Sequence, residues 1–431
     1  MLTGQMHAAH SHVSPYYPDH SLRTILCFVV VIGVTIAAAS IADGSEIRAV
    51  PSLAVGEEYD DNIFLVPERE SADYITHVVP AIEAKYASPI WEWQLSYAYD
   101  RRYYAKYTYI DDSVQRARLR STVQIVKDLL FFDVRDDAGR TSLTAVRDYT
   151  QESPVQNQTD YNAFELGPYA VLQLTSQTTL TTGYLYRSVW YEDPLAIDRT
   201  EHSVYGDISL KQTERTDLNA SVRRDRVETS MNKWTRTSFL FGPRYEYQDG
   251  AFLWGRIGPS RTAVENAGTD THLVWDAGIT YRLGSMTVSG ETGRTWVEDP
   301  YRVERREDRY VADLRVASER TSGGLSVAMR DYGIGRYNDE RRYTTTADFS
   351  HFLKERLKAK YALTVNRYDR YPVDAPDTST IVYQTDVRFD YHASEKFTMS
   401  LSYRYTDSYS ANIYYDNYAV NRVLIEAKMS F

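Results

Sequence analysis

From Asp43 onward, apolar and polar residues alternate along many short segments of the chain. In one of them Trp91, Trp93 and Leu95 occupy one parity, while Glu92 and Gln94 occupy the other. A period of two places the two sets on opposite faces of a β-strand. This part of the sequence shows no 3.6-residue periodicity, which an amphipathic helix would require. The pattern therefore predicts an all-β chain.

The alternation is equally clear toward the C-terminal end. It runs through 357–366, 383–391 and 397–405, where aromatic and aliphatic residues share one parity and charged or hydroxyl residues share the other. Strands with one apolar and one charged face fit a wall that separates lipid from water.

Short turns and longer connections also alternate along the chain. The longer connections are predicted at Asp60–Ser71, Gly139–Gln158, Tyr191–Thr200, Asp299–Asp308, Tyr332–Arg341 and Tyr368–Ser379. Tight periplasmic turns and long extracellular loops are typical of a transmembrane β-barrel. We predict a single antiparallel barrel of about 20 strands, with about 18 as the alternative. An even number places both termini on the periplasmic side.

Composition favours this barrel over a soluble protein with several sheets. The chain has 37 Tyr against 13 Phe and 7 Trp. Tyrosine has an apolar ring and a polar tip, so it suits the girdles where a barrel wall meets the membrane interface. A soluble protein of this length would need more than one core rich in Ile, Leu and Val.

The long apolar run of the sequence is Thr24–Ala42. It fits a secretory signal, because Arg23 precedes it and Ser40-Ile-Ala42 forms a cleavage-like site before Asp43. A transmembrane helix is the alternative. Cys27, the single cysteine, lies at the start of the run and away from the cleavage-like site, which argues against a lipid anchor. We predict a signal region at 1–42, with the true start at Met6 or later, and a barrel at 43–431.

The last strand ends on an aromatic residue with no polar tail. Its segment resembles the C-terminal signal of bacterial outer-membrane barrels, which implies recognition by the barrel assembly machinery. The residues that carry this resemblance are Tyr418, Val423, Ile425, Met429 and Phe431.

Residues of the parity opposite to the apolar face are candidates for lining the barrel interior. They are Arg116, Arg118, Arg120, Asp133, Arg135, Arg187, Arg223, Arg244, Arg256, Asp276, Asp313, Arg315, Arg330, Asp348, Arg388, Asp390 and Arg404. Two interpretations stay open. Arginine and aspartate pair across strands and stiffen the wall, or an arginine-rich lining guides anions through a wet channel.

Other functional classes receive little support. With 49 basic and 59 acidic residues the net charge is −10, which argues against a nucleic-acid binder. The 9 histidines have no zinc-site spacing, and nothing distinguishes His202, His272 or His351 as catalytic. Acidic residues in the predicted loops, at 57–61 and at Asp111, Asp112, Asp374, Asp377 and Asp416, match no calcium-loop spacing. We expect no enzyme, no metal and no cofactor.

The stretches Pro51–Leu65 and Ser71–Tyr86 resemble the opening of a family of outer-membrane β-barrel porins of the "beta-barrel porin 2" type. The distinctive part is Glu-Tyr-Asp-Asp-Asn at 58–62, followed by Asp73-Tyr-Ile-Thr76 and Pro80. Some members of that family accompany exopolysaccharide and PEP-CTERM/exosortase genes. The resemblance implies a role in polysaccharide export or envelope biogenesis, and it transfers no binding residues.

Three functions follow as alternatives. The first is an outer-membrane channel that exports an exopolysaccharide or another envelope polymer, with a periplasmic export protein and an anionic polysaccharide as partners. The second is a general diffusion porin for small solutes. The third is a plugged structural barrel, or a sleeve for a partner protein.

Overall fold

The computed structural model describes residues 45–67, 71–265, 268–301, 304–334, 337–372 and 376–431. The predicted signal region 1–42, with Met6, Arg23 and Cys27, lies outside the described residues, as does Asp374. No helix in the described ranges is long and apolar enough to cross a membrane.

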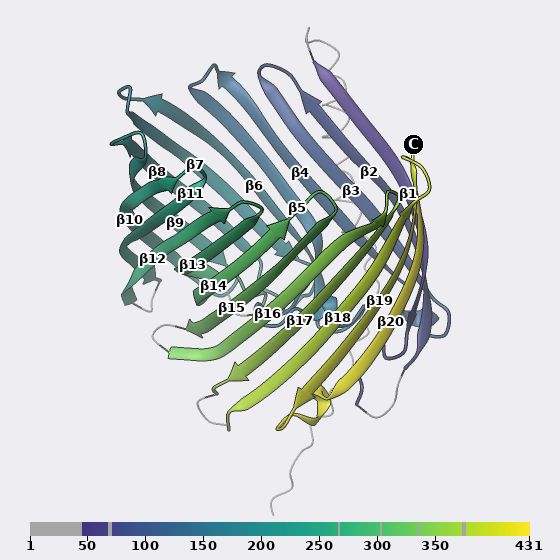
Figure 1. Ribbon diagram of the computed structural model, residues 1–431. Coiled ribbons are helices and arrows are strands. Elements are labelled where there is room, and N and C mark those ends of the chain that lie inside the picture. Colours follow the sequence, from purple (N-terminus) through teal and green to yellow (C-terminus); the bar gives the residue numbers. More distant parts are fainter. Residues whose placement is uncertain (1–44, 68–70, 266–267, 302–303, 335–336, 373–375) are drawn as a thin grey trace, which may run out of the picture.

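The described chain is almost entirely β-structure, arranged as one antiparallel sheet (Figure 1). The strands are β1 Glu46–Asp60, β2 Asp73–Ala87, β3 Trp91–Tyr104, β4 Asp112–Val126, β5 Leu130–Ser142, β6 Gln158–Gln173, β7 Thr178–Tyr191, β8 Arg199–Lys211, β9 Thr216–Thr229, β10 Lys233–Gln248, β11 Ala251–Val264, β12 Gly268–Leu283, β13 Met286–Val297, β14 Arg305–Ala317, β15 Thr321–Ile334, β16 Tyr337–Lys354, β17 Leu357–Arg370, β18 Thr378–His392, β19 Phe397–Ser410 and β20 Tyr418–Ser430. Short 3₁₀ helices lie at Thr108–Ile110, Tyr149–Gln151 and Tyr414–Asp416.

The first and last strands pair with each other and close the sheet. β1 and β20 run antiparallel from Ser52 opposite Ser430 to Asp60 opposite Arg422, and the two strands lie side by side in Figure 1. The main-chain N–H of Phe431 donates to the carbonyl oxygen of Pro51 over 2.9 Å. The predicted barrel is thus confirmed as a 20-stranded closed sheet, and the smaller alternative of 18 strands is wrong.

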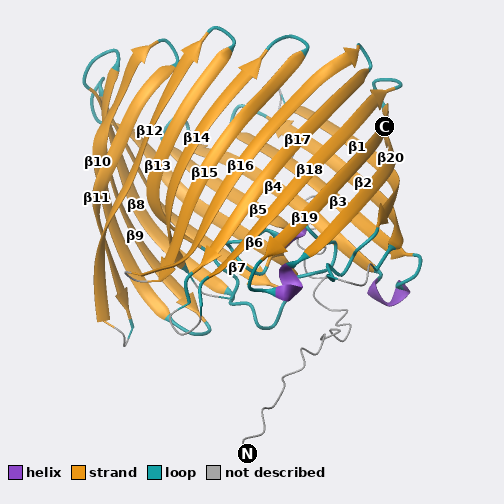
Figure 2. Cartoon of the chain, turned by 60° about the horizontal axis from the view of Figure 1, so that its bottom comes forward, coloured by secondary structure: helices purple, strands orange, loops and turns teal. Residues whose placement is uncertain are grey.

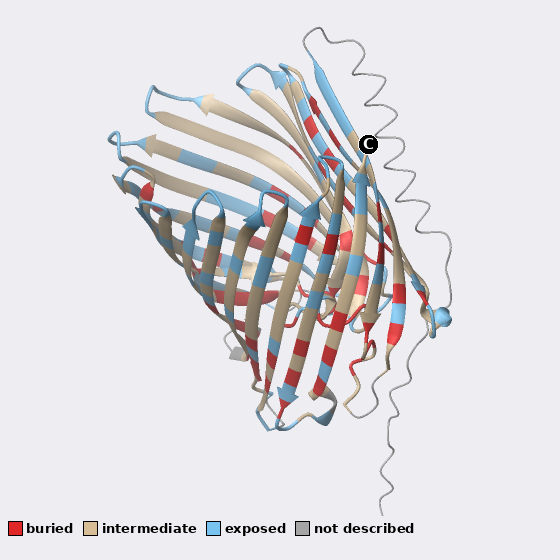
Figure 3. Ribbon diagram, turned by 45° about the vertical axis from the view of Figure 1, so that its right-hand side comes forward, coloured by how far each residue is buried: buried red, intermediate tan, exposed pale blue. Residues whose placement is uncertain are grey.

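Closure gives the sheet an outer and an inner face, because directly paired residues point to the same side. Leu53 and Val55 of β1, with Phe239 and Phe241 of β10, are large apolar side chains exposed on the outer face. Charged and hydroxyl residues occupy the opposite parity of these strands. Figure 3 shows many buried positions toward the ends of the strands that carry the long loops.

The two ends of the barrel differ in their connections (Figure 2). Short turns and the C-terminus lie at one end, while the longer loops, such as residues 143–157 between β5 and β6, lie at the other. One predicted loop, Tyr332–Arg341, is wrong. Strands β15 and β16 continue through most of it, and Arg341 forms an ion pair across the hairpin with Asp331.

Glycine allows a close approach of two backbones between β10 and β11. A Cβ atom at Gly242 would overlap the backbone carbonyl oxygen of Gly255. A Cβ atom at Gly206 in β8 would instead lie 3.8 Å from the Cγ1 atom of Val222, an ordinary contact. The wall therefore tolerates a side chain at one glycine and excludes it at the other.

We expect Gly242→Ala to destabilise the barrel by about 1–3 kcal/mol, because the backbone must move to relieve the overlap. Gly206→Ala is the control and should behave like the wild type. Urea unfolding of the refolded protein, followed by heat-modifiable mobility in gels, measures both. Equal unfolding midpoints for the two variants would show that the close approach imposes no constraint.

Candidate functional site

The strand register places every arginine and aspartate of the predicted lining on a single face of the sheet. The pairs Arg118 with Asp137, Arg256 with Asp276, and Asp386 with Arg404 each lie directly opposite one another in neighbouring strands. Arg116, Arg118 and Arg404 border a common cavity of about 690 Å³. Since β4 and β19 approach this cavity from different parts of the wall, the shared face is the interior of the barrel.

Most of these arginines form ion pairs. Arg118 lies 2.8 Å from Asp137 and Arg256 lies 2.6 Å from Asp276. Further pairs on the predicted residues include Arg116–Asp100, Arg120–Asp137, Arg135–Asp133, Arg187–Glu165, Arg223–Asp225, Arg315–Asp348, Arg330–Glu307, Arg388–Asp390 and Arg404–Asp386. The interior is therefore a network of opposite charges, in line with the stiffened-wall interpretation.

Arg244 and Asp313 stand apart from this network. The Arg244 guanidinium lies 4.0 Å from the ring centroid of Phe252, a cation–π contact, and its register partner on β9 is Asp217. Asp313 pairs in register with Ser289 and Ser326. Within the described ranges neither side chain has an ion-pair partner within 4.0 Å.

The carboxylates that complete the network were missed by the sequence prediction. Asp100, Asp137 and Glu165 share the inward parity of the arginines that they bind. Parity and register account for two of them, because Asp137 lies directly opposite Arg118 and Glu165 lies directly opposite Arg135. Asp100 lies opposite Val114, so it reaches Arg116 only diagonally across the sheet. When these carboxylates are included, the excess of arginine over acidic residues on the inner wall is smaller than the predicted lining residues indicated.

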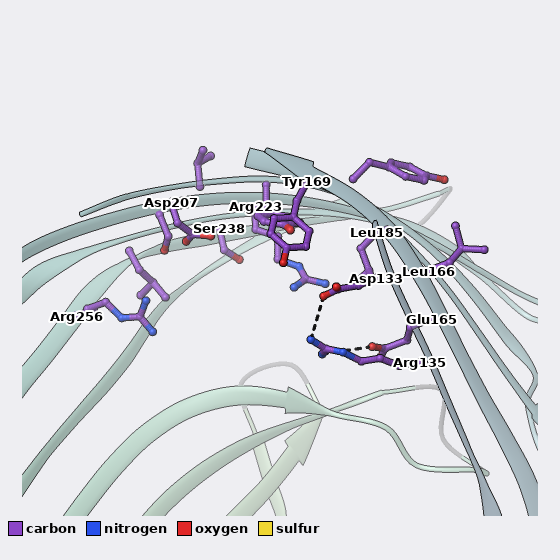
Figure 4. Close-up of a pocket in the computed structure, with 16 residues that line it drawn as sticks. Asp133, Arg135, Glu165, Leu166, Tyr169, Leu185, Asp207, Arg223, Ser238 and Arg256 are labelled. Atoms are coloured by element: carbon purple, nitrogen blue, oxygen red, sulfur yellow. Dashed lines mark ion pairs between the residues drawn. The ribbon is translucent and has the colours of Figure 1, made fainter. Parts of the chain in front are cut away.

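One part of the inner wall forms a pocket of about 430 Å³ between β5 and β11 (Figure 4). The Arg135 guanidinium lies between two carboxylates, 3.6 Å from Asp133 and 4.0 Å from Glu165. The rings of Tyr169 and Tyr205 line the same pocket. Arginine forks, carboxylates and tyrosine rings together offer hydrogen bonds and flat apolar contact, which suit a hydroxylated or charged solute.

The β5–β6 loop, residues 143–157, crosses the mouth at the long-loop end. Arg147 extends from this loop to β19 and β20, where its Nη2 atom donates to Ser408 over 3.2 Å and to Tyr418 over 2.7 Å. Further along the loop, Ser153 donates to the carbonyl oxygen of Ile63 over 2.9 Å. The loop thus leaves the wall at β5 and β6 and is tied to the β1–β2 loop, to β19 and to β20.

Arg147 is the centre of this attachment, which we call the latch: Arg147, Glu152, Ser408, Asp416 and Tyr418. The Arg147 and Glu152 side chains are 1% and 3% exposed and lie 2.7 Å apart. Asp416 lies 3.3 Å from Arg147, and the Tyr418 hydroxyl donates to Glu152. Burial opposes the charge of Arg147, but the hydrogen bonds and the negative charge of Glu152 outweigh it and raise the pKa of the guanidinium.

Inner-wall arginines hold the same loop by its backbone. Arg422 donates to the carbonyl oxygen of Glu152 over 2.5 Å and also bonds Asp60 across the β1–β20 seam. Arg404 donates to the carbonyl oxygen of Gln151 over 3.4 Å. The closing seam of the barrel and the loop across its mouth therefore share side chains.

Two other loops meet the β5–β6 loop at the mouth. In the β13–β14 loop, Asp299 accepts from the main-chain N–H of Ala145 over 3.2 Å, and Glu298 pairs with Arg187 of the inner wall. Tyr301 donates to Asp193 of the β7–β8 loop over 3.2 Å. Burial, with the nearby Asp193 carboxylate, raises the pKa of Tyr301 to about 12, so its hydroxyl keeps its proton at neutral pH.

Several acidic residues that were predicted to lie in loops make contacts within the protein, and one of them, Asp112, begins β4. Asp111 accepts from the main-chain N–H of Tyr104 over 2.8 Å, Asp112 pairs with Arg140, and Asp61 accepts from Asn421 over 2.7 Å. In the described part of the chain, no group of three or more His, Cys, Asp or Glu side chains is arranged to hold a metal ion.

The three singled-out histidines lie on different strands and contact different residues. His202 accepts from or donates to the Tyr184 hydroxyl at 2.6 Å, His272 lies 3.0 Å from Asp270, and His351 lies 2.8 Å from the Thr321 hydroxyl. The structure does not bring them together.

The residues of the C-terminal segment divide between the two faces. Val423, Ile425, Met429 and Phe431 share the outward parity, and Ile425, Met429 and Phe431 are exposed there. Tyr418 has the opposite parity and belongs to the latch.

No protein-family model matches the chain, and no curated protein does. Among solved structures, the FrpB iron transporter of Neisseria meningitidis (F5-1 variant, apoprotein form) is similar with a TM-score of 0.50 at 9% identity, over 89% of this chain and 81% of that one. OpdQ of Pseudomonas aeruginosa gives 0.45 at 9% identity over 90% and 100% of the two chains. OpdK of the same organism, an outer membrane protein, gives 0.42 at 10% identity over 89% and 99%. At these identities the likeness to FrpB shows the fold alone: this chain has the closed β-barrel fold of outer-membrane proteins.

We expect Arg147→Met to increase single-channel conductance. The substitution leaves the Glu152 carboxylate buried without its counter-charge, which destabilises the latched position of the loop by about 3–5 kcal/mol. Replacing both residues, as Arg147→Met with Glu152→Leu, should restore much of the wild-type conductance, since an apolar pair needs no counter-charge.

Gln156→Ala in the same loop is the control, because within the described residues its side chain holds no hydrogen bond. Planar-bilayer recording of the refolded variants measures all of these effects. If the folded Arg147→Met barrel conducts exactly like wild type, the latch does not restrict the mouth.

Proposed function

We propose that this protein is a gated outer-membrane channel that exports an exopolysaccharide or another anionic envelope polymer. The observation that carries the proposal is the β5–β6 loop, which is latched across the mouth by Arg147. A channel that must pass a long polymer needs a wide barrel and a means of closing it between transport events. The barrel of 20 strands is of the size class that encloses water, and the loop spans its mouth.

The lining of the barrel supports a polymeric anion. Arg118, Arg120 and Arg116 have side chains that are 65%, 53% and 56% exposed although each lies near a carboxylate. Arginines that are paired yet accessible attract a passing carboxylate without a deep binding well. The pocket that contains Tyr169 and Arg135 adds flat and hydrogen-bonding surface for sugar rings.

The two alternatives make different predictions. A general diffusion porin needs a mouth that is open at rest, whereas the latch ties the loop to β19 and β20. A plugged barrel or a sleeve for a partner protein would stay closed after the latch is broken. The partners that belong to the proposal are a periplasmic export protein, the barrel assembly machinery acting on the outward residues of β20, and the export machinery that reads the predicted signal 1–42.

Bilayer recording with an added acidic polysaccharide tests the proposal. We expect the Arg147→Met barrel to conduct steadily and the polymer to block that current from the short-turn side. Conductance that is indifferent to the polymer would favour the diffusion porin. If the folded, heat-modifiable Arg147→Met barrel carried no current, the result would contradict both open-channel functions and favour the plugged structural barrel.

In the same latch-broken background, replacing Arg116, Arg118 and Arg120 with Gln should weaken the block at least about threefold, because three accessible charges are lost and Asp137 is left without its arginines. Arg101→Gln is the matched control, since the register places Arg101 on the outward face opposite Val78. If the Arg101→Gln control weakened the polysaccharide block as much as the triple variant, the lining arginines would have no specific role in attracting the polymer.

A further inference from the structure

Basic side chains form a row on the outward face of β9, β10 and β11. Arg224 of β9 and Arg261 of β11 both pair in register with Thr237 of β10, so the two arginines flank this threonine on one face. Both are exposed. Adjacent strands lie about 4.8 Å apart, which puts the Cα atoms of the two arginines about 10 Å from each other. We call Arg224, Thr237 and Arg261 the outer basic row.

The outer basic row lies at the edge of the apolar band. On its short-turn side come Val222, Phe239 and Ile257, which are 49%, 46% and 53% exposed on the same face. On its long-loop side come Arg226, which pairs in register with Thr235, and Lys233. This edge is the level at which a barrel wall passes from acyl chains to lipid headgroups.

The arginines of the outer basic row differ from several outward arginines near the same end of the barrel that form ion pairs. Arg294 lies 2.5 Å from Asp308, and Arg367 lies 2.9 Å from Asp369. Arg226 is paired as well, 2.8 Å from Glu228. Across the ranges that the structure describes, Arg224 and Arg261 have no carboxylate within ion-pair distance. Their charges are therefore available to a group outside the protein.

The charges around the row remain predominantly positive. Lys233 and Arg226 share Glu228, and Glu265, a further acidic residue of outward parity, directly follows the end of β11. Next to them, the Tyr186 and His202 rings of β7 and β8 meet edge-on with centroids 5.3 Å apart. An aromatic pair beside unpaired arginines is suited to the interfacial layer of a membrane.

We propose that the outer basic row binds the phosphate groups of a phosphorylated glycolipid in the membrane leaflet at the long-loop end. The planar guanidinium fork matches phosphate oxygens, and its interaction with them strengthens at the edge of a low-dielectric layer. The spacing of the two arginines suits a headgroup that carries more than one phosphate. The proposal rests on the outer-membrane placement of the barrel but not on its transport of a polymer.

The test compares lipid retention by wild type and by Arg224→Gln with Arg261→Gln. Each detergent-solubilised, folded protein is mixed with diphosphorylated lipid A, or with lipid A from which the phosphates have been removed, and bound lipid is counted by native mass spectrometry. We expect wild type to bind the phosphorylated lipid about tenfold more tightly than the double variant, as the loss of a charge-assisted hydrogen bond predicts. The dephosphorylated lipid should not distinguish the two proteins.

Arg367→Gln is the matched control, because Arg367 also has outward parity and lies near the long-loop end but already pairs with Asp369. Equal binding by wild type and the double variant, or an equal loss in the control, would overturn the proposal. A change from oligomer to monomer in the double variant, with lipid binding retained, would overturn it in favour of contact with a second copy. Conductance recorded in parallel separates this outcome from a failure of the export proposal.

Discussion

The pairing of β1 with β20 is the constraint on which the rest of the molecule depends. A strand in a membrane has no water to satisfy its N–H and C=O groups, so every edge must be paired. Closure by this seam removes the last free edges and makes the inner and outer faces distinct along all strands. A single slip of register at any pair would exchange the faces of a strand. The Arg422–Asp60 ion pair across the seam fixes the final register where the sheet joins itself.

The charge pattern of the interior follows from the same closure. Inward residues of neighbouring strands are held at fixed distances. Arginines without carboxylate neighbours would therefore repel one another in the confined interior. The structure instead alternates them: Arg135 stands between Asp133 and Glu165, and Glu165 also binds Arg187. Such ladders stiffen the wall and still leave half-exposed arginine side chains facing the solvent of the interior.

The sequence was sufficient for the class of fold because period-two parity is a local property of each strand. It placed Arg118 and Arg404 on the inward parity before any pairing was known. Parity carries no information on where a loop goes, however, so Arg147, Glu152 and the latch were missed. The hairpin at Asp331 and Arg341 was mistaken for a loop for a related reason: its charged outward residues look solvated in sequence, and only the ion pair across the hairpin shows that they continue the strands.

The latch also shows why a loop can be held firmly in place without adding much to overall stability. Burying Arg147 and Glu152 removes two charges from water, and their mutual attraction roughly offsets that cost. What the pair provides is specificity: the Arg147 guanidinium contacts Glu152, Tyr418 and Ser408 at the same time, which defines one position for this part of the loop. Because Arg422 binds both the Glu152 carbonyl of this loop and Asp60 across the closing seam, the position of the loop and the register of the wall depend on a shared side chain.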